Sequence, residues 1–204
     1  EYKIDKIILW TNSKLSHCFF KKPWLKIYET DKFSNNGILL RTLWQIFILP
    51  RIAKRKNVNI MLTPGGSICR FKPYITMCRN LLPFMPQEAK RYGLSITFIR
   101  LMILRFTQSY SFKNSNGLIF LSDFAKSVVN KEIRIDYKNS KIIPHGISDR
   151  FRIYPKKNKE YLKNNNSIIF NLLYVSIIDV YKHQWHLIKA IYQLRKKGFF
   201  LNLH

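Results

Sequence analysis

Apolar residues follow two alternating patterns along this chain, and together they predict an α/β protein. Short continuous apolar or β-branched runs, typical of strands buried on both faces, recur from one end to the other. The predicted strands are residues 7–10, 58–62, 74–78, 118–121, 141–143, 168–175 and 199–203. Because segments with helical periodicity separate these strands, we expect mostly parallel sheets with helices on both faces.

The predicted helices lie between these strands, in segments 39–47, 98–106, 124–129 and 187–197, and a basic stretch at 51–56 follows the first of them. Ser122 precedes the third of them as a capping residue. The last is the clearest, because its apolar face is followed by the basic turn 195–197 and then by Gly198 as its stop.

A lysine- and asparagine-rich segment with few apolar residues, 154–167, indicates a linker. We therefore predict a Rossmann-like domain over residues 1–153 and the start of a second Rossmann-like domain over residues 168–204. The chain begins without Met and ends soon after the second domain starts, so we expect a fragment that lacks strands at its amino-terminal end.

The net charge of the chain predicts the sign of its partner's charge. Lys and Arg number 36 against 11 Asp and Glu, and the formal net charge of +25 predicts an anionic partner. Nucleic acid, an anionic membrane and a phosphorylated small molecule all fit this charge. The three cysteines are scattered along the chain, which predicts reduced thiols in a cytosolic protein. No apolar run reaches the roughly 18 residues that a membrane-spanning helix needs.

Two turns at strand ends are candidate binding positions. Gly65 and Gly66 follow a predicted strand, where they either let a ligand approach the backbone or form an ordinary tight turn. Arg79 and Asn80 follow strand 74–78, at the end that faces the ligand crevice in open parallel sheets. An exposed arginine beside a turn-forming asparagine explains the same two residues.

Further candidates lie in the carboxy-terminal third. His145, followed by Gly146, is either a proton carrier or a hydrogen-bonded structural residue. Lys182 stands just before the last helix, where it could hold a diphosphate together with the helix N-terminus, or could be one more solvated lysine. His183 and His186 can share a helix face, but without a third ligand nearby in sequence they predict no metal site.

The order of five segments along nearly the whole chain resembles bacterial glycosyltransferases of the GT-B fold, family four type. These segments are residues 64–66, 77–84, 119–125, 142–147, and 174–176 with Lys182. The resemblance implies that the first domain binds an acceptor and the second a nucleotide-sugar donor. It also implies a reaction in the cleft between the domains, without a cofactor or an essential metal.

Carried onto this sequence, the resemblance implies that Lys182 contacts the donor diphosphate. The implied cleft-lining residues are Gly65, Gly66, Arg79, Asn80, His145, Gly146 and Ser176. The family's usual Gly-Arg-Leu before the lysine is replaced by Ser176-Ile177-Ile178, so the arginine partner is missing. The chain also ends before the region where the family's paired glutamates bind the donor, and we expect this fragment alone to be inactive.

The expected function is transfer of a sugar from a nucleotide-sugar donor to a hydroxyl of a glycan or lipid-linked acceptor, in cell-envelope polysaccharide synthesis. We expect a cytoplasmic protein that contacts the anionic inner face of the membrane. One alternative is a non-catalytic remnant of such an enzyme. The other is a basic nucleic-acid-binding α/β protein, which the spread of Lys and Arg over almost every segment disfavours.

Overall fold

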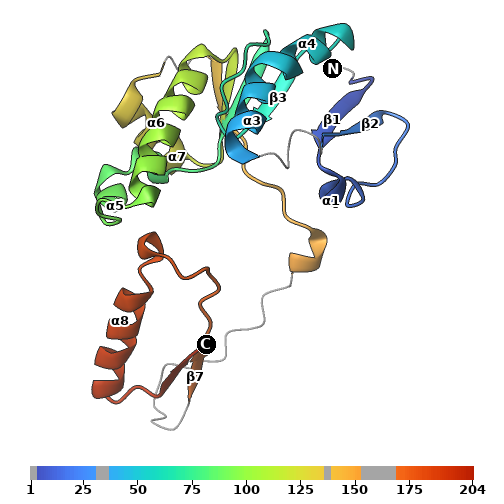
Figure 1. Cartoon of the computed structure of the whole chain (residues 1–204). Helices are drawn as coiled ribbons and strands as arrows, with labels where there is room; N and C mark the ends of the chain where they lie inside the picture. The colour runs from blue at the N-terminus through green and yellow to red at the C-terminus, as the bar shows by residue number, and fades with distance from the viewer. Residues whose placement is uncertain (1–3, 31–36, 136–138, 153–168) are drawn as a thin grey trace. The chain divides into compact units, whose positions relative to one another are not determined.

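The computed structural model describes residues 4–30, 37–135, 139–152 and 169–204 (Figure 1). The chain divides into two compact units. The first contains Glu1–Arg79 and Phe106–Ile142, and the second contains Asn80–Arg105 and Ile143–His204. The predicted linker, residues 154–167, lies outside the described residues, and the predicted domain boundaries stay a prediction.

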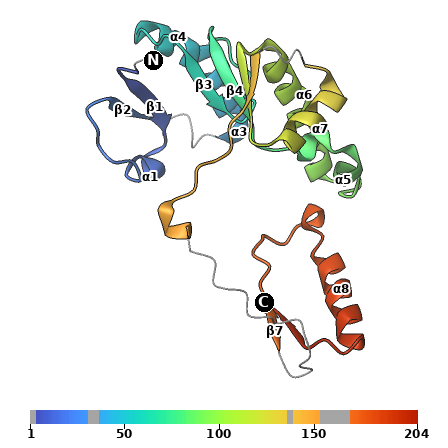
Figure 2. The ribbon, with the colours of Figure 1, turned by 180° about the vertical axis from the view of Figure 1, so that it is seen from behind.

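A four-stranded parallel sheet is the centre of the first unit. Its strands are β3 (Met61–Pro64), β4 (Tyr74–Cys78), β5 (Gly117–Phe120) and β6 (Ser140–Ile142). They pair in chain order, as Figure 2 shows for β3 and β4, and every pairing is parallel. The predicted α/β class with a parallel sheet, Rossmann-like in general kind, is confirmed.

Helices connect these strands and precede them. The longest, α6 (Ile96–Asn114), leads from β4 to β5, and α7 (Asp123–Ile133) leads from β5 to β6. Ser122 caps α7 as predicted, because its hydroxyl accepts a hydrogen bond from the Ala125 amide at 3.2 Å. The other helical elements of this part of the chain are α1 (Ser13–Ser16), α3 (Gly37–Leu43), the π-helix η1 (Trp44–Ile48), α4 (Leu49–Arg55), the 3-10 turn η2 (Leu82–Phe84) and α5 (Pro86–Lys90).

Alternate residues of β4 supply much of the core. Tyr74, Thr76 and Cys78 point to one side and are fully buried, as the period of two in a strand requires. The Tyr74 hydroxyl donates to the Ser111 carbonyl oxygen at 2.9 Å, which ties the strand to α6. This packing anchors β4 in the core of the first unit.

The three cysteines form no disulfide, in agreement with the prediction of free thiols. Cys18 is exposed, whereas Cys69 and Cys78 are buried. Burial raises the pKa of the Cys78 thiol to about 12, so this residue remains an unreactive thiol within the core.

The described carboxy-terminal part of the second unit is a βαβ motif, as predicted. Strands β7 (Phe170–Leu172) and β8 (Leu201–Leu203) pair in parallel. Between them come the 3-10 turn η5 (Val180–Lys182) and helix α8 (Gln184–Lys196). Gly198, at φ 89°, follows the helix as its predicted stop, because a left-handed conformation there favours glycine. A further 3-10 turn, η4 (Asp149–Phe151), precedes this motif.

Several strand predictions are wrong in detail. The strand predicted at 58–62 begins at Met61, because the Val58 amide donates to the Ala53 carbonyl oxygen and still belongs to the end of α4. The strand predicted at 168–175 covers only Phe170–Leu172 among the described residues.

At the amino-terminal end, the predicted strand 7–10 is β1 (Ile7–Thr11), which pairs with β2 (Leu25–Glu29) in a separate sheet. The prediction missed β2 because Lys26 and Glu29 interrupt its apolar run. Among the helices that the structure describes, none has the length and apolar character needed to cross a bilayer.

Candidate functional site

The turn after β3 contains both predicted glycines, and packing explains one of them. Gly65 and Gly66 adopt φ values of 129° and 70°, a region that L side chains rarely enter. A Cβ atom added to Gly66 would lie 2.7 Å from Gln108 Cγ and 2.9 Å from Phe112 Cε1, whereas one on Gly65 would meet nothing within 4 Å. Gly66 therefore allows α6 to approach this turn, and Gly65 leaves the backbone accessible.

Arg79, the first residue after β4, lies at the same carboxyl edge as this glycine turn, because neighbouring parallel strands end together. Arg79 is exposed and adds a positive charge. The Asn80 side-chain oxygen accepts a hydrogen bond from the Leu82 amide at 3.1 Å, so Asn80 also has the turn-forming role considered for it.

His145 and Gly146 follow β6 and are both exposed. Gly146 has a backbone conformation open to any residue, and a Cβ atom there would meet nothing within 4 Å. The position therefore accommodates larger side chains, and no local packing accounts for the glycine.

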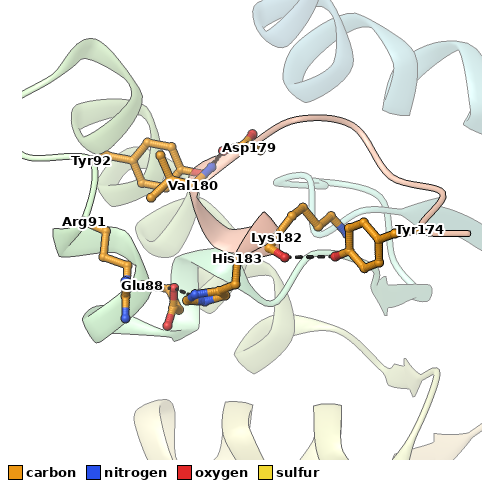
Figure 3. Close-up of polar contacts among 8 residues, drawn as sticks. All are labelled: Glu88, Arg91, Tyr92, Tyr174, Asp179, Val180, Lys182 and His183. Carbon is orange, nitrogen blue, oxygen red and sulfur yellow. Dashed lines mark hydrogen bonds and ion pairs between the residues drawn. The ribbon is translucent and has the colours of Figure 1, made fainter. Parts of the chain in front are cut away.

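The segment between β7 and α8 contains the other predicted residues, Ser176 and Lys182. We call residues 173–183 the β7 turn. The hydroxyl of Tyr174 donates to the Lys182 carbonyl oxygen at 2.9 Å, which closes the turn on itself (Figure 3). The Lys182 ammonium lies 4.7 Å from the centre of the Tyr181 ring, and the Ser176 hydroxyl donates to the Ile177 carbonyl oxygen at 3.1 Å.

Two side chains from α5 and the residues after it hold the β7 turn. The Tyr92 hydroxyl donates to Asp179 Oδ1 at 2.5 Å, and His183 Nε2 lies 3.1 Å from Glu88 Oε2 (Figure 3). Arg91 Nε also pairs with the Glu88 carboxylate at 3.2 Å. The α5 region and the β7 turn are thus joined within the second unit by contacts between residues far apart in sequence.

His183 is the bend at which the β7 turn becomes α8. It is not a glycine, yet it adopts the left-handed φ of 57°. Its ring stacks on that of His186 at 5.2 Å between centroids. The Nδ1 atom is buried and has no hydrogen-bond partner among the described residues, which is consistent with a ring placed by its Glu88 contact.

Burial and the neighbouring Asp179 carboxylate raise the pKa of Tyr92 to about 12. The phenol therefore stays protonated at neutral pH and remains a hydrogen-bond donor to Asp179. The same carboxylate accepts from the Val180 amide at 2.6 Å and so caps η5, whose last residue is Lys182.

Five of the eight predicted residues thus fall into two groups, and the other three, Asn80, His145 and Gly146, belong to the second unit outside the β7 turn. Gly65, Gly66 and Arg79 belong to the carboxyl edge of the sheet in the first unit, and Ser176 and Lys182 belong to the β7 turn of the second unit. In sequence, Lys182 comes two positions before the start of α8, whose first backbone amides lack partners within the helix and attract anions. Among the described residues, no three His, Cys, Asp or Glu side chains gather as metal ligands.

Sequence reasoning missed the residues that hold this turn. Glu88, Tyr92 and Asp179 stand in unremarkable local patterns. The contact of Tyr92 with Asp179 joins positions 87 residues apart, and that of Glu88 with His183 joins positions 95 residues apart. One signal in the sequence could have pointed to Glu88 and Asp179: acidic residues are rare in this strongly basic chain, and these two are among only 11.

Comparison with known proteins finds no family model and no curated protein that matches this sequence.

Proposed function

We propose that this chain is part of a glycosyltransferase of the GT-B type, which transfers a sugar from a nucleotide-sugar donor to a hydroxyl of a glycan or lipid-linked acceptor. The observation that supports this best is the position of Lys182, in a braced turn between a parallel strand and the N-terminus of α8. A cation next to a helix N-terminus suits the diphosphate group of such a donor.

In this proposal, Lys182 acts on the leaving group. When the bond between the sugar and the nucleoside diphosphate breaks, negative charge grows on the departing phosphate oxygen. The Lys182 ammonium and the first amides of α8 stabilise that charge, and the backbone that carries them needs little reorganisation because the Tyr174 and Asp179 hydrogen bonds already hold it.

The proposed acceptor side is the carboxyl edge of the sheet in the first unit, at the glycine turn after β3 and at Arg79 after β4. Gly65 leaves the backbone accessible, and Arg79 adds a cation next to it along the sheet edge. Asn80, His145 and Gly146, which belong to the second unit, are further candidates that the resemblance suggests. The task of the acceptor side is to align an acceptor hydroxyl with the anomeric carbon of the sugar, which lowers the entropic part of the barrier.

The direct test measures binding of UDP, GDP and ADP, and of their sugar conjugates, by titration calorimetry. The protein is expressed from the complete reading frame that encodes this chain. We expect Lys182→Ala to weaken the binding of the preferred nucleotide about tenfold, the usual cost of one charged hydrogen bond. The matched control is Lys189→Ala, which removes an exposed lysine of α8.

Each outcome separates one interpretation from another. Binding followed by release of nucleoside diphosphate in the presence of an acceptor supports the enzyme. Binding without turnover identifies a non-catalytic remnant. Absence of nucleotide binding, or equal losses in the two lysine variants, contradicts the proposed role of Lys182.

A further inference from the structure

Helix α6 has apolar residues on two sides, but only one of them is covered. Its inward side contains the buried Leu101, Gln108 and Phe112. On the outward side is a row of exposed apolar residues that we call the α6 stripe: Ile96, Ile99, Ile103, Phe106 and Tyr110. Successive members are three or four positions apart, so they lie on one face of the helix.

The exposure of the α6 stripe is large for side chains of this size. Ile96 is 86% exposed and Phe106 is 71% exposed. Leu94, just before the helix, is also exposed. From Ile96 to Tyr110 the row extends for about 21 Å along the helix axis. A continuous apolar row of this length on a protein surface indicates an interaction site.

The charges next to the stripe limit what can cover it. Helix α6 contains no acidic residue. At 100° per residue, Arg100 and Lys113 flank the stripe on opposite sides. A second copy of this chain would itself carry a net charge of +25, and repulsion between two such chains opposes self-association. An anionic surface with an apolar layer beneath it could contact both the cations that flank the stripe and the apolar side chains of the stripe.

We infer that the α6 stripe docks on an anionic membrane surface. The helix would lie parallel to the bilayer, with its isoleucine and phenylalanine side chains among the lipid chains and its cations at the headgroups. Because the opposite side of α6 is packed inside the protein, only the outward side chains enter the bilayer. This contact does not rest on the glycosyltransferase proposal, since vesicle binding and nucleotide binding are separate measurements.

The test is cosedimentation of the purified chain with vesicles of phosphatidylcholine, with and without phosphatidylglycerol. We expect binding that requires phosphatidylglycerol and weakens with added salt. Ile103→Ser should reduce the affinity for anionic vesicles about tenfold, because one buried isoleucine is lost from the lipid contact. Arg100→Gln should reduce it about fivefold.

A matched control is available on another helix. Ile188 of α8 is 60% exposed and Ile103 is 59% exposed, so Ile188→Ser makes the same chemical change at an equally exposed position outside the stripe. We expect this control to bind as the unchanged chain does. Circular dichroism melting curves verify that all variants are folded.

Three results would overturn the inference. Equal binding to vesicles without anionic lipid would remove the role of charge. Equal losses in the Ile103 and Ile188 variants would remove the role of the stripe. A dimer in light scattering that Ile103→Ser converts to a monomer would show that a second copy covers this face.

Discussion

Two turns that follow parallel strands, the glycine turn after β3 and the β7 turn, are held in place in opposite ways. The glycine turn depends on a missing side chain, since Gly66 lies against Gln108 and Phe112. The β7 turn depends on side chains that are present, because Tyr92 and Glu88 reach it from another part of the second unit. The first kind of turn can be recognised locally in sequence, whereas the second depends on contacts that form only in the fold.

The two turns also differ in the groups that they can offer to a ligand. The glycine turn can offer a ligand its backbone, but it has no charged side chain of its own. The β7 turn includes Lys182, and the Tyr174 hydroxyl holds the carbonyl oxygen of that residue. If the β7 turn is a binding site, its affinity for an anion should depend on the residues that brace it as well as on the lysine itself.

The largest effect should come from filling the space at Gly66. We expect Gly66→Ala to lower the free energy of unfolding by about 3 kcal/mol, because the new Cβ overlaps two buried side chains and the backbone has a positive φ. Urea denaturation followed by circular dichroism measures the change.

Gly65→Ala separates the cost of backbone strain from the cost of steric overlap. Gly65 has a φ of 129° but open space around it, so only backbone strain of about 1–2 kcal/mol is expected. Gly146→Ala, with neither positive φ nor a neighbour within 4 Å, should change stability least of the three. If Gly65→Ala and Gly66→Ala cost the same, the packing of α6 against this turn does not explain Gly66.

Much of the fold follows from the sequence, because its signals are local. The continuous apolar run at 74–78 matches β4 to the residue, Ser122 caps α7, and Gly198 ends α8. Predictions failed where pairing partners decide the outcome. β2 is a strand because it pairs with β1, and its own mixture of polar and apolar residues does not distinguish it from a loop.

The next effect in size concerns the link between Tyr92 and Asp179. We expect Tyr92→Phe to lower the free energy of unfolding by about 1.5 kcal/mol, since it removes a hydrogen bond to a carboxylate and leaves the ring in place. Hydrogen exchange in the peptide 174–187 should quicken, because the β7 turn loses one of its braces.

Tyr192→Phe is the control for this change. Tyr192 lies on α8 and is exposed, so loss of its hydroxyl should leave both stability and exchange unaltered. Equal exchange rates in the two variants would show that the Tyr92 contact does not hold the β7 turn.

The hydrogen bond between Tyr92 and Asp179 should also make the stability of the protein fall at alkaline pH. The pKa of Tyr92 is raised to about 12, above its ordinary value of about 10, so the folded state favours the protonated phenol. This stabilisation is complete below about pH 10 and is lost as the pH rises toward 12. The stability difference between the unchanged chain and Tyr92→Phe should therefore shrink across this interval. A difference that stays constant would contradict the raised pKa.

The site itself could be predicted from sequence only in part. Lys182 is recognisable because a lysine before a predicted helix is a local pattern. The contacts that hold the turn around Lys182 are not recognisable in the sequence. Tyr92 and Asp179 are 87 positions apart, and the sequence does not say which hydroxyl will meet which carboxylate over such a separation. His183 shows the same limit, since its left-handed backbone follows no glycine or asparagine signal.

The smallest expected effect is the coupling between Glu88 and His183. Both side chains are partly exposed, so a double-mutant cycle with Glu88→Gln and His183→Asn should give about 0.5 kcal/mol. Asparagine is chosen at position 183 because it tolerates the left-handed backbone found there. Glu88→Gln should cost more than His183→Asn, because Glu88 also pairs with Arg91. A coupling of zero would show that the Glu88–His183 contact does not stabilise the fold, and would leave the hydrogen bonds of Tyr92 and Tyr174 to hold the β7 turn.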